Sequence, residues 1–374
     1  MPNFLEIKPV DKSYLEQIGF TWHRDVGQDY IVQEKLLVVT PTEAKAYENA
    51  ANKIYEMYEV GAEYVIKNNL FDALDIPSHL VEPIKISWLN ERNNHLYGRF
   101  DLSGGLDGHS IKLIEFNADT PTLLLESTVV QWMQLEFNKF EDKKQFNNIY
   151  EALGKRFVAI AKEEKGAFSK FLFSSVESST EEVNTVKLLE QIAKDSELLT
   201  KFTYLEEISF DELSILDENE NCFDFWFKLY PWEEMQAFEP TLQTKLLNPA
   251  FTLLYQSKGM LAILYELFPK SPYLLETAFT PLECKYVKKQ MFGREGANID
   301  IVEDGKLLRT TQGIYDAYKS IYQEYVTFVK DEEQYHYQAG VFYAGGACGV
   351  GFRRGAEILD NMSQFIGHII KEGK

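Results

Sequence analysis

The chain has 374 residues, of which 45% are hydrophobic and 14% are aromatic. This composition indicates a packed globular protein and excludes a largely disordered one. The chain carries 38 Lys and Arg residues against 58 Asp and Glu residues, so its formal net charge at pH 7 is −20. Such a charge argues against DNA, RNA or an anionic membrane surface as a partner, and it suits a cationic ligand such as a polyamine.

The cysteines and histidines show no pattern typical of a disulfide framework or a zinc site. Cys222, Cys284 and Cys348 form no CxxC motif, and their odd number excludes complete internal pairing, which indicates reduced thiols. The six histidines show no HxH or HExxH spacing. Because the N-terminus lacks a signal-peptide pattern and no apolar stretch reaches about 20 residues, we expect a cytoplasmic protein. The sequence gives no indication of the oligomeric state.

The first predicted element is a long helix from Pro41 to about Asn68. Thr40-Pro41-Thr42-Glu43 combines an N-cap, a proline at the first helical position and a glutamate three residues after the cap. Apolar residues then recur at helical spacing. Further helices are expected over about 122–140, 145–162 and 181–194.

The pattern changes from helical to alternating between the first two helices. Residues 96–102 and 111–117 alternate apolar with polar side chains and flank a turn-rich segment that contains Asp107-Gly108. This arrangement predicts a β-hairpin. Residues 170–174 are predicted to form a buried strand ahead of the helix at 181, which gives a βα unit in the middle of the chain.

A second strand pair is expected in the last third of the chain. Residues 286–292 and 298–302 would form it, joined by the glycine-bearing loop 293–296. The sequence contains no internal repeat, no low-complexity tract and no Pro- or Ser-rich linker. We therefore expect closely packed parts that form a single unit.

Four polar residues of the hairpin would share one face. Side chains alternate along a strand, so folding the hairpin would place Asp101 near Glu115 and Arg99 near Asn117. Two carboxylates, an amide oxygen and a guanidinium suit Mg²⁺ that carries nucleotide phosphates. The alternative is a cross-strand ion pair on a solvated face. Residues 118–122 add polar groups at a helix start, where free N–H groups attract anions.

Lysines lie next to two glycine-containing segments in the second half of the chain. Lys288 and Lys289 precede the loop 293–296, where glycines let a backbone approach phosphate oxygens and a lysine supplies positive charge. Lys258 is the one charge that enters an apolar helix running to Phe268. The Walker A pattern is absent, which excludes a P-loop NTPase. An ordinary hairpin turn and a snorkelling lysine are the alternatives.

The C-terminal segment 340–354 is rich in glycine and is predicted to form two short strands. Its glycines would lie where backbones approach one another or a ligand. Arg353 or Arg354 is a candidate for binding a phosphate or a carboxylate, and an exposed arginine pair is the alternative. Cys348 has no adjacent histidine and is expected to be a small core residue.

Taken together, these motifs resemble the synthetase domain of the glutathionylspermidine synthase family, an ATP-grasp family of carboxylate–amine ligases. The resemblance runs from about Trp22 to the C-terminus in the family's order. The segments that carry it are Gly98–Asp101, Glu115–Thr122, Glu126, Gln131-Trp132, Tyr230–Glu233, Ser257–Gly259, Val287–Lys289, Gly293–Gly296, Tyr322–Glu324 and the end through Arg353.

The resemblance implies a mixed α/β fold that is ATP-grasp-like. The metal-site motif precedes the lysines, the reverse of the common ATP-grasp order, which implies a circular permutation. The implied subregions are a metal-site hairpin with helices at 1–165, a βα subdomain at 166–250, and a nucleotide-binding lid with the C-terminal sheet at 251–374.

The resemblance also implies roles for individual residues. Asp101, Glu115 and Asn117 match the Mg²⁺ ligands, and Arg99 and Lys289 match catalytic groups at the transferring phosphoryl. The residues implied to contact ATP are Lys258, Lys289, Gly293, Arg294, Gly296, Gln323 and Glu324. Those implied to meet the substrates are Thr120, Thr122, Glu126 and Arg353.

The implied activity is ATP-dependent amide bond formation through an acyl phosphate, with glutathione and a polyamine as the family's substrates. Two departures bear on this. The chain has no cysteine before Cys222, so the amidase of the bifunctional members is not expected. Threonines stand at positions 120 and 122 where the family's synthetases have serines, and Leu229-Tyr230-Pro231 replaces a more polar stretch. A ligase for another peptide or amino acid and another amine, and a non-catalytic nucleotide- or polyamine-binding relative, are therefore the alternatives.

Overall fold

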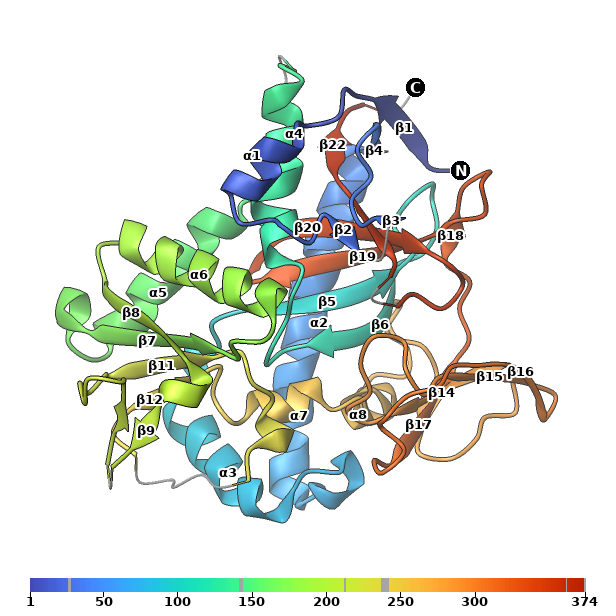
Figure 1. Cartoon of the computed structure of the whole chain (residues 1–374). Helices are drawn as coiled ribbons and strands as arrows, with labels where there is room; N and C mark the ends of the chain where they lie inside the picture. The colour runs from blue at the N-terminus through green and yellow to red at the C-terminus, as the bar shows by residue number, and fades with distance from the viewer. Residues whose placement is uncertain (26–27, 141–143, 212, 237–241, 361, 373–374) are drawn as a thin grey trace.

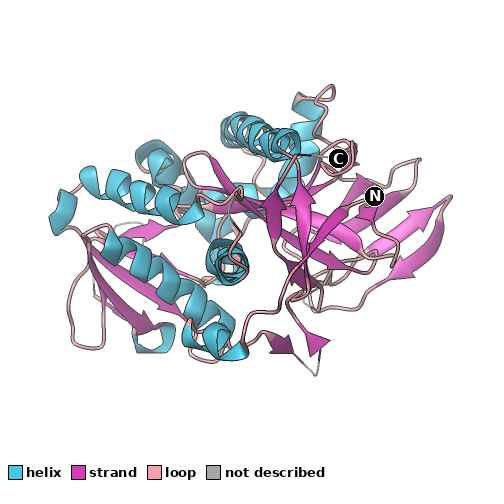
Figure 2. Cartoon of the chain, turned by 90° about the horizontal axis from the view of Figure 1, so that it is seen from above, coloured by secondary structure: helices cyan, strands magenta, loops and turns pink. Residues whose placement is uncertain are grey.

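The computed structural model describes residues 1–25, 28–140, 144–211, 213–236, 242–360 and 362–372. These residues form a mixed α/β fold with parallel and antiparallel sheets (Figure 1). The helices gather at one end of the molecule and strands dominate the other end (Figure 2). No helix of the described residues is both long and apolar enough to cross a membrane.

An antiparallel sheet in the middle of the molecule carries the predicted hairpin. Its order is β21-β20-β19-β5-β6, with β18 beside β19. The predicted hairpin is confirmed, although its first strand begins two residues later than expected, and so are the two glycine-rich C-terminal strands. The strands are β5 (Gly98–Ser103), β6 (Lys112–Asn117), β18 (Val329–Lys330), β19 (His336–Tyr343), β20 (Ala347–Gly355) and β21 (Gln364–Ile366).

Helix α2 (Pro41–Asn68) covers one face of this sheet and has the predicted bounds. Its N-terminus is closed by a capping box, in which the Thr40 N–H donates to the Glu43 carboxylate at 2.8 Å and the Glu43 N–H donates to Thr40 Oγ1 at 3.2 Å. Phe100 of β5 and Phe116 of β6 stack at 3.8 Å and pack against Tyr58 of α2. Because side chains alternate along a strand, the polar residues beside these rings face away from α2.

A parallel sheet forms the end of the molecule where the helices gather. Its order is β12-β11-β7-β8, and the β7–α6–β8 connection confirms the predicted βα unit. Helices α5 and α6 pack against each other beside it. The elements are α5 (Ile149–Lys162), β7 (Lys170–Ser175), α6 (Thr180–Asp195), β8 (Leu199–Tyr204), β11 (Phe225–Lys228) and β12 (Lys245–Leu247).

A second antiparallel sheet lies at the opposite end, in the order β13-β17-β14-β15-β16. It contains the predicted strand pair that flanks the glycine loop. Helix α8 follows Lys258 as expected and packs against α2. The elements are α7 (Thr252–Gln256), α8 (Gly259–Leu267), β13 (Thr277–Ala278), β14 (Tyr286–Gln290), β15 (Asp300–Glu303), β16 (Lys306–Thr310) and β17 (Ser320–Glu324).

The remaining α-helices and strands include the segments at the two ends of the chain. Strand β4 pairs with β1 and with β22, which brings the N- and C-terminal segments together. They are β1 (Asn3–Glu6), α1 (Lys12–Gln17), β2 (Arg24–Asp25), β3 (Gln28–Asp29), β4 (Lys35–Val39), α3 (Val81–Asn90), α4 (Gln131–Phe137), β9 (Ser209–Phe210), β10 (Ile215–Leu216) and β22 (His368–Ile370).

Two predicted helix boundaries differ from the structure. The helix expected over about 122–140 begins at Leu124, passes through a π-helical turn at Glu126–Val130 and ends as α4 at Phe137. The helix expected from 145 begins at Ile149, because residues 146 and 148 form backbone hydrogen bonds with β20 instead. Periodicity alone does not show such tertiary competition for backbone groups.

Candidate active site

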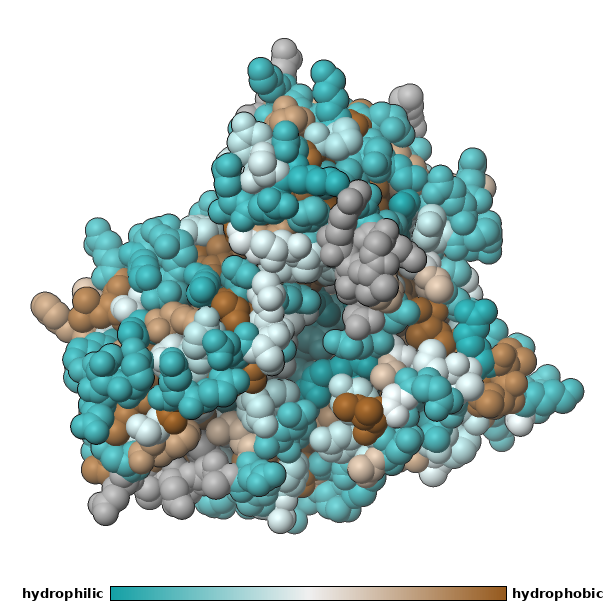
Figure 3. All heavy atoms as spheres, in the orientation of Figure 1, coloured by the Kyte–Doolittle hydropathy of each residue, from teal (hydrophilic) through white to brown (hydrophobic). Residues whose placement is uncertain are grey.

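Two cavities meet at the polar face of the β5–β6 hairpin. Cavity A has an empty volume of about 830 Å³ and lies between β6, β14, β17, the glycine loop and residues 357–359. Cavity B has an empty volume of about 1340 Å³ and lies between the hairpin, residues 229–234 and the same loop. Both include open solvent, and Figure 3 shows a hollow with a hydrophilic floor on this side of the molecule.

The structure divides the predicted site residues between these two cavities. Cavity A is lined by all seven residues predicted to contact ATP: Lys258, Lys289, Gly293, Arg294, Gly296, Gln323 and Glu324. Cavity B is lined by Arg99, Asp101, Glu115, Asn117, Thr120, Thr122 and Arg353. Glu115 lines both cavities, so the predicted metal ligands lie at their junction.

The hairpin register is the predicted one, with Arg99 opposite Asn117 and Asp101 opposite Glu115. Arg99 binds Asp101 through two hydrogen bonds, from Nε to Oδ1 at 2.6 Å and from Nη2 to Oδ2 at 2.9 Å. The Asn117 amide donates to Asp101 at 3.1 Å and to Glu115 at 3.5 Å. Arg99 does form an ion pair, as the alternative interpretation proposed, but both residues lie on β5 and their side chains are only 10% and 6% exposed, so the pair is neither cross-strand nor on a solvated face.

Arg99 is fixed from two further directions. Its Nη1 donates to the Thr122 carbonyl oxygen at 2.8 Å. Gly340 of β19 pairs with Asp101, and a Cβ atom at this glycine would lie 2.9 Å from Arg99 Cδ. The glycine therefore leaves the room in which the arginine side chain crosses the neighbouring strand.

Lys258 is buried, and its ammonium group contacts other residues of the protein. The alternative interpretation as a snorkelling lysine is therefore wrong. Its Nζ donates to the Gly293 carbonyl oxygen at 2.6 Å and lies 3.1 Å from Glu115 Oε2. Burial alone would raise the pKa of Glu115, but Lys258 and Lys289 outweigh burial and lower the pKa to about 2. The Glu115 carboxylate is therefore ionised at neutral pH.

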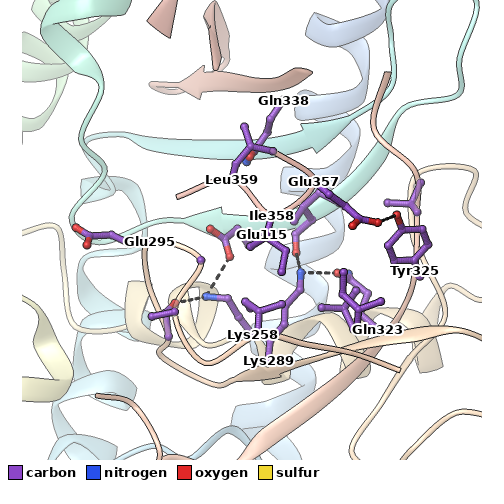
Figure 4. A pocket seen from close by; sticks show the side chains of 18 of the residues that line it. Glu115, Lys258, Lys289, Glu295, Gln323, Tyr325, Gln338, Glu357, Ile358 and Leu359 are labelled. Carbon is purple, nitrogen blue, oxygen red and sulfur yellow. Dashed lines mark hydrogen bonds and ion pairs between the residues drawn. The ribbon is translucent and has the colours of Figure 1, made fainter. Parts of the chain in front are cut away.

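Lys289, and not Lys288, points into cavity A. Lys289 Nζ donates to Gln323 Oε1 at 2.7 Å (Figure 4), whereas Lys288 is partly exposed near Asp300 on the other face of β14. Burial lowers the pKa of Lys289 to about 8, although Glu115 opposes this decrease more strongly than the neighbouring Lys258 adds to it. Lys289 is therefore mostly protonated at pH 7 and loses its positive charge as the pH rises through 8.

The far end of cavity A has a different chemical character from the lysine end. Tyr325 follows β17 and donates a hydrogen bond to Glu357, which also lies 3.3 Å from Arg309. Figure 4 places Tyr325 and Glu357 together, away from Lys258 and Glu115. Cavity A thus has a cationic end near Glu115 and an end with a carboxylate, a hydroxyl and apolar side chains.

Glu126 lies outside the linings of both cavities. Its carboxylate is buried and accepts a hydrogen bond from Trp22 Nε1 at 3.1 Å. Burial, assisted by Glu181, raises its pKa to about 7. Its predicted contact with substrate therefore stays a prediction, while Thr120, Thr122 and Arg353 do line cavity B.

Two ion pairs between segments far apart in sequence were not predicted. Lys228 Nζ lies 3.2 Å from Asp119 Oδ1, and both side chains are fully buried. Arg294 of the glycine loop pairs with Glu233, which follows β11. One sequence signal for the first pair existed, because a single lysine at the end of the apolar strand Phe225–Lys228 needs a buried partner.

The oxygen-rich donor set at the junction fits a hard cation. Among the described residues, no group of three or more His, Cys, Asp or Glu side chains is arranged to hold a metal ion. The Asn117 amide nevertheless lies within hydrogen-bonding distance of both Asp101 and Glu115. Two carboxylates and an amide are ligands that suit Mg²⁺ and do not suit a thiophilic metal.

The fold and the two cavities define an ATP-grasp-like protein. The chain is similar in structure to a glutathione synthetase-like effector from Globodera pallida in its apo form, with a TM-score of 0.57. The likeness covers 90% of this chain and 89% of that chain at 12% sequence identity, so it concerns the fold alone. The mixed α/β, ATP-grasp-like fold expected from the sequence is confirmed.

The chain belongs to the glutathionylspermidine synthase preATP-grasp family, whose model matches residues 3–371. It is 29% identical to a Haemophilus influenzae protein named "Putative acid--amine ligase", over 95% of both chains. It is 25% identical to the bifunctional glutathionylspermidine synthetase/amidase of Escherichia coli, over 95% of this chain. Trypanothione synthetase of Crithidia fasciculata is 22% identical over 81% of this chain.

The relatives differ in how much of their length this chain matches. The chain spans 61% of the Escherichia coli protein and 51% of the Crithidia fasciculata protein, against 95% of the Haemophilus influenzae protein. All three relatives are named as ligases or synthetases, so the chain is a member of a ligase family.

Proposed function

We propose that the chain is an ATP-dependent carboxylate–amine ligase that forms an amide bond through an acyl phosphate. The observation that carries this proposal is the position of Glu115, which lines both cavities between Lys258 and Lys289 on one side and the Arg99–Asp101 pair on the other. A phosphoryl group that leaves a nucleotide in cavity A would meet an acceptor in cavity B at this junction.

Cavity A suits the nucleotide. Lys258 and Lys289 would contact the phosphate oxygens at its cationic end, and the backbone of the Gly293–Gly296 loop would cover them. Gln323 and Glu324, at the end of β17, would lie beside the base. This orientation follows from charge, because Glu357 at the far end would repel phosphate.

The hairpin suits phosphoryl transfer. Asp101, Glu115 and Asn117 would hold Mg²⁺, which when bound neutralises negative charge on the phosphate oxygens. Arg99 would stabilise charge on the phosphoryl group as it transfers, since Asp101 and the Thr122 carbonyl oxygen already hold its guanidinium in place. A preorganised guanidinium needs little rearrangement during the reaction.

The proposed reaction has two steps. An oxygen of the substrate carboxylate attacks the γ-phosphorus, the bond from that phosphorus to the bridging oxygen breaks, and ADP leaves with an acyl phosphate remaining. The amine nitrogen then attacks the acyl carbon, the carbon–oxygen bond to phosphate breaks, and the amine loses a proton. The glycine loop would exclude water, which otherwise hydrolyses the acyl phosphate.

Cavity B suits a carboxylate and a cationic amine. Thr120, Thr122 and Arg353 would bind the acid, with the arginine as its charge partner. Glu182, Glu234 and Glu295 line the same cavity, and an ammonium group would pair with them. Glutathione and spermidine, the components in the name of the Escherichia coli relative, are the first substrates to test.

Oxygen transfer tests the acyl phosphate directly. Wild-type protein would be incubated with Mg²⁺-ATP, an amine and a carboxylate substrate labelled with ¹⁸O, first glutathione with spermidine and then panels of peptides, amino acids and amines. We expect one ¹⁸O atom in inorganic phosphate for each amide formed. Amide formation with unlabelled phosphate would contradict the mechanism. Asp101→Asn and Lys289→Ala are each expected to abolish turnover, and full activity in either variant would contradict the site assignment.

A further inference from the structure

The glycine loop, residues 293–296, is held by contacts along its length. Lys258 Nζ donates to the Gly293 carbonyl oxygen at 2.6 Å, and Thr311 Oγ1 donates to the Gly296 carbonyl oxygen at 2.6 Å. Gly296 has a φ of +68°, and a Cβ atom there would lie 2.5 Å from the Leu359 carbonyl oxygen. The residues that make these contacts are Lys258, Thr311 and Leu359.

Among the described residues, the ion pair of Arg294 with Glu233 ties the loop to the segment that follows strand β11. Glu233 belongs to the 3-10 helix Trp232–Glu234, which follows the parallel sheet. The Glu233 side chain is 0% exposed and that of Arg294 is 22% exposed. The second carboxylate oxygen of Glu233 is buried and has no hydrogen-bond partner among the described residues, so Arg294 is the main compensation for this buried charge.

The helix that carries Glu233 is itself rigidly held. The Trp232 N–H donates to Asp119 Oδ2 at 2.9 Å, and Trp232 Nε1 donates to the Asn248 carbonyl oxygen at 2.9 Å. Lys228 Nζ donates to the Tyr230 carbonyl oxygen at 2.6 Å and pairs with Asp119. The buried Lys228–Asp119 pair therefore fixes the position from which Glu233 reaches the loop.

We propose that Glu233 is a positioning residue that anchors the glycine loop through Arg294 and so holds this arginine between cavities A and B. Arg294 lines both cavities, so the anchor sets where its guanidinium meets whatever occupies them. Without the anchor, the loop keeps its contacts with Lys258, Thr311 and Leu359, and Arg294, which is partly exposed, turns toward water. This inference does not depend on the proposed ligase activity.

Limited trypsin digestion of the full chain without ligand tests the anchor. Trypsin cleaves after Arg294 only when the loop opens, and the rate follows the population of the open form. We expect Glu233→Gln to raise cleavage after Arg294 by about tenfold or more, because a charge-assisted bond is lost. Mass spectrometry would follow the new N-terminus at Glu295. Cleavage after Lys306, the exposed first residue of β16, is the internal standard and should not change.

Two further variants keep the test specific. Glu234→Gln changes the neighbouring carboxylate of the same helix and should leave cleavage after Arg294 at the wild-type rate. Arg294→Lys keeps a trypsin site but loses the guanidinium, and it should raise cleavage as Glu233→Gln does. The double variant Glu233→Gln with Arg294→Lys should be no more sensitive than either single variant, because all three lack the guanidinium–carboxylate contact.

Several results would overturn the proposal. Equal cleavage of wild type and Glu233→Gln would do so, as would additive effects in the double variant. If Glu233→Gln lowers the thermal midpoint of the whole chain, the Arg294→Lys variant becomes the test of the anchor. Cleavage of Arg294→Lys at the wild-type rate would then refute the anchor.

A kinetic experiment rests on the proposed function: Glu233→Gln should lower kcat while KM for ATP stays within about twofold, since Lys258 and Lys289 remain. Absence of wild-type turnover would count against the ligase only, and the cleavage result would still stand.

Discussion

Replacing Gly340 with alanine would displace Arg99 without removing any polar group of the site. The added Cβ atom would lie 2.9 Å from Arg99 Cδ, whereas carbon atoms in contact prefer separations of about 3.5–4.0 Å. The arginine would therefore shift by roughly 0.6–1.1 Å if β19 stays in place. Arg99 cannot swing aside freely, because hydrogen bonds of 2.6, 2.9 and 2.8 Å hold its guanidinium to Asp101 and to the Thr122 carbonyl oxygen.

The expected consequence is a loss of turnover with the fold preserved. A displacement of about 1 Å at a catalytic group can lower the rate about 10²-fold, so we expect a decrease of that order in kcat for Gly340→Ala. Phosphate release from Mg²⁺-ATP with a carboxylate and an amine measures the rate, and thermal unfolding measures the fold. The matched control is Gly346→Ala in the same β19–β20 hairpin, where the nearest atom to a Cβ is 3.9 Å away. A Gly340→Ala protein that works at the rate of this control would refute the reasoning about Arg99.

Three further predictions follow from the buried charges. Lys228→Met should lower the free energy of unfolding by about 3–5 kcal/mol in urea titrations, because Asp119 is left buried without its cation. Adding Asp119→Asn should restore part of the lost free energy. A loss below about 1 kcal/mol in Lys228→Met would contradict the prediction. Lys289→Ala should weaken nucleotide binding at least about tenfold in calorimetry while Lys288→Ala stays within about twofold, and equal effects would show that the wrong lysine was chosen. Burial lowers the pKa of Lys289 to about 8, so the lysine loses its proton and its positive charge as the pH rises through 8. Nucleotide affinity should then fall by up to about tenfold per pH unit. A Lys289→Met protein should bind nucleotide more weakly but without this decline.

The local part of the site was predictable because it depends on period and register. The capping box at Thr40 and Glu43 predicted where α2 begins, and alternation in 96–102 and 111–117 predicted the hairpin. A strand period of two then placed Asp101 opposite Glu115 without knowledge of the rest of the molecule. The resemblance also assigned Lys258 and the glycine loop to one nucleotide site, and the structure places the two in contact through the bond from Lys258 to Gly293.

The remainder depends on contacts between distant segments. Alternation shows that Lys288 and Lys289 lie on opposite faces of a strand, but only the position of β6 and β17 decides which face borders the cavity. The Glu233–Arg294 pair joins residues that are 61 positions apart, and the Lys228–Asp119 pair joins residues that are 109 apart. Such contacts leave no periodic signal in a single sequence: the lone lysine at the end of the apolar strand 225–228 indicates a buried partner but does not identify Asp119.

The most direct test of the central claim is phosphate release from Mg²⁺-ATP by the purified protein, with and without its two substrates. Glutathione with spermidine would be tried first, followed by panels of small peptides, amino acids and amines, with Asp101→Asn as the blank. We predict release that requires a carboxylate and an amine together and that disappears in Asp101→Asn. Release that needs neither substrate, or a protein that binds no nucleotide, would contradict a ligase whose transfer site lies at the junction of the two cavities.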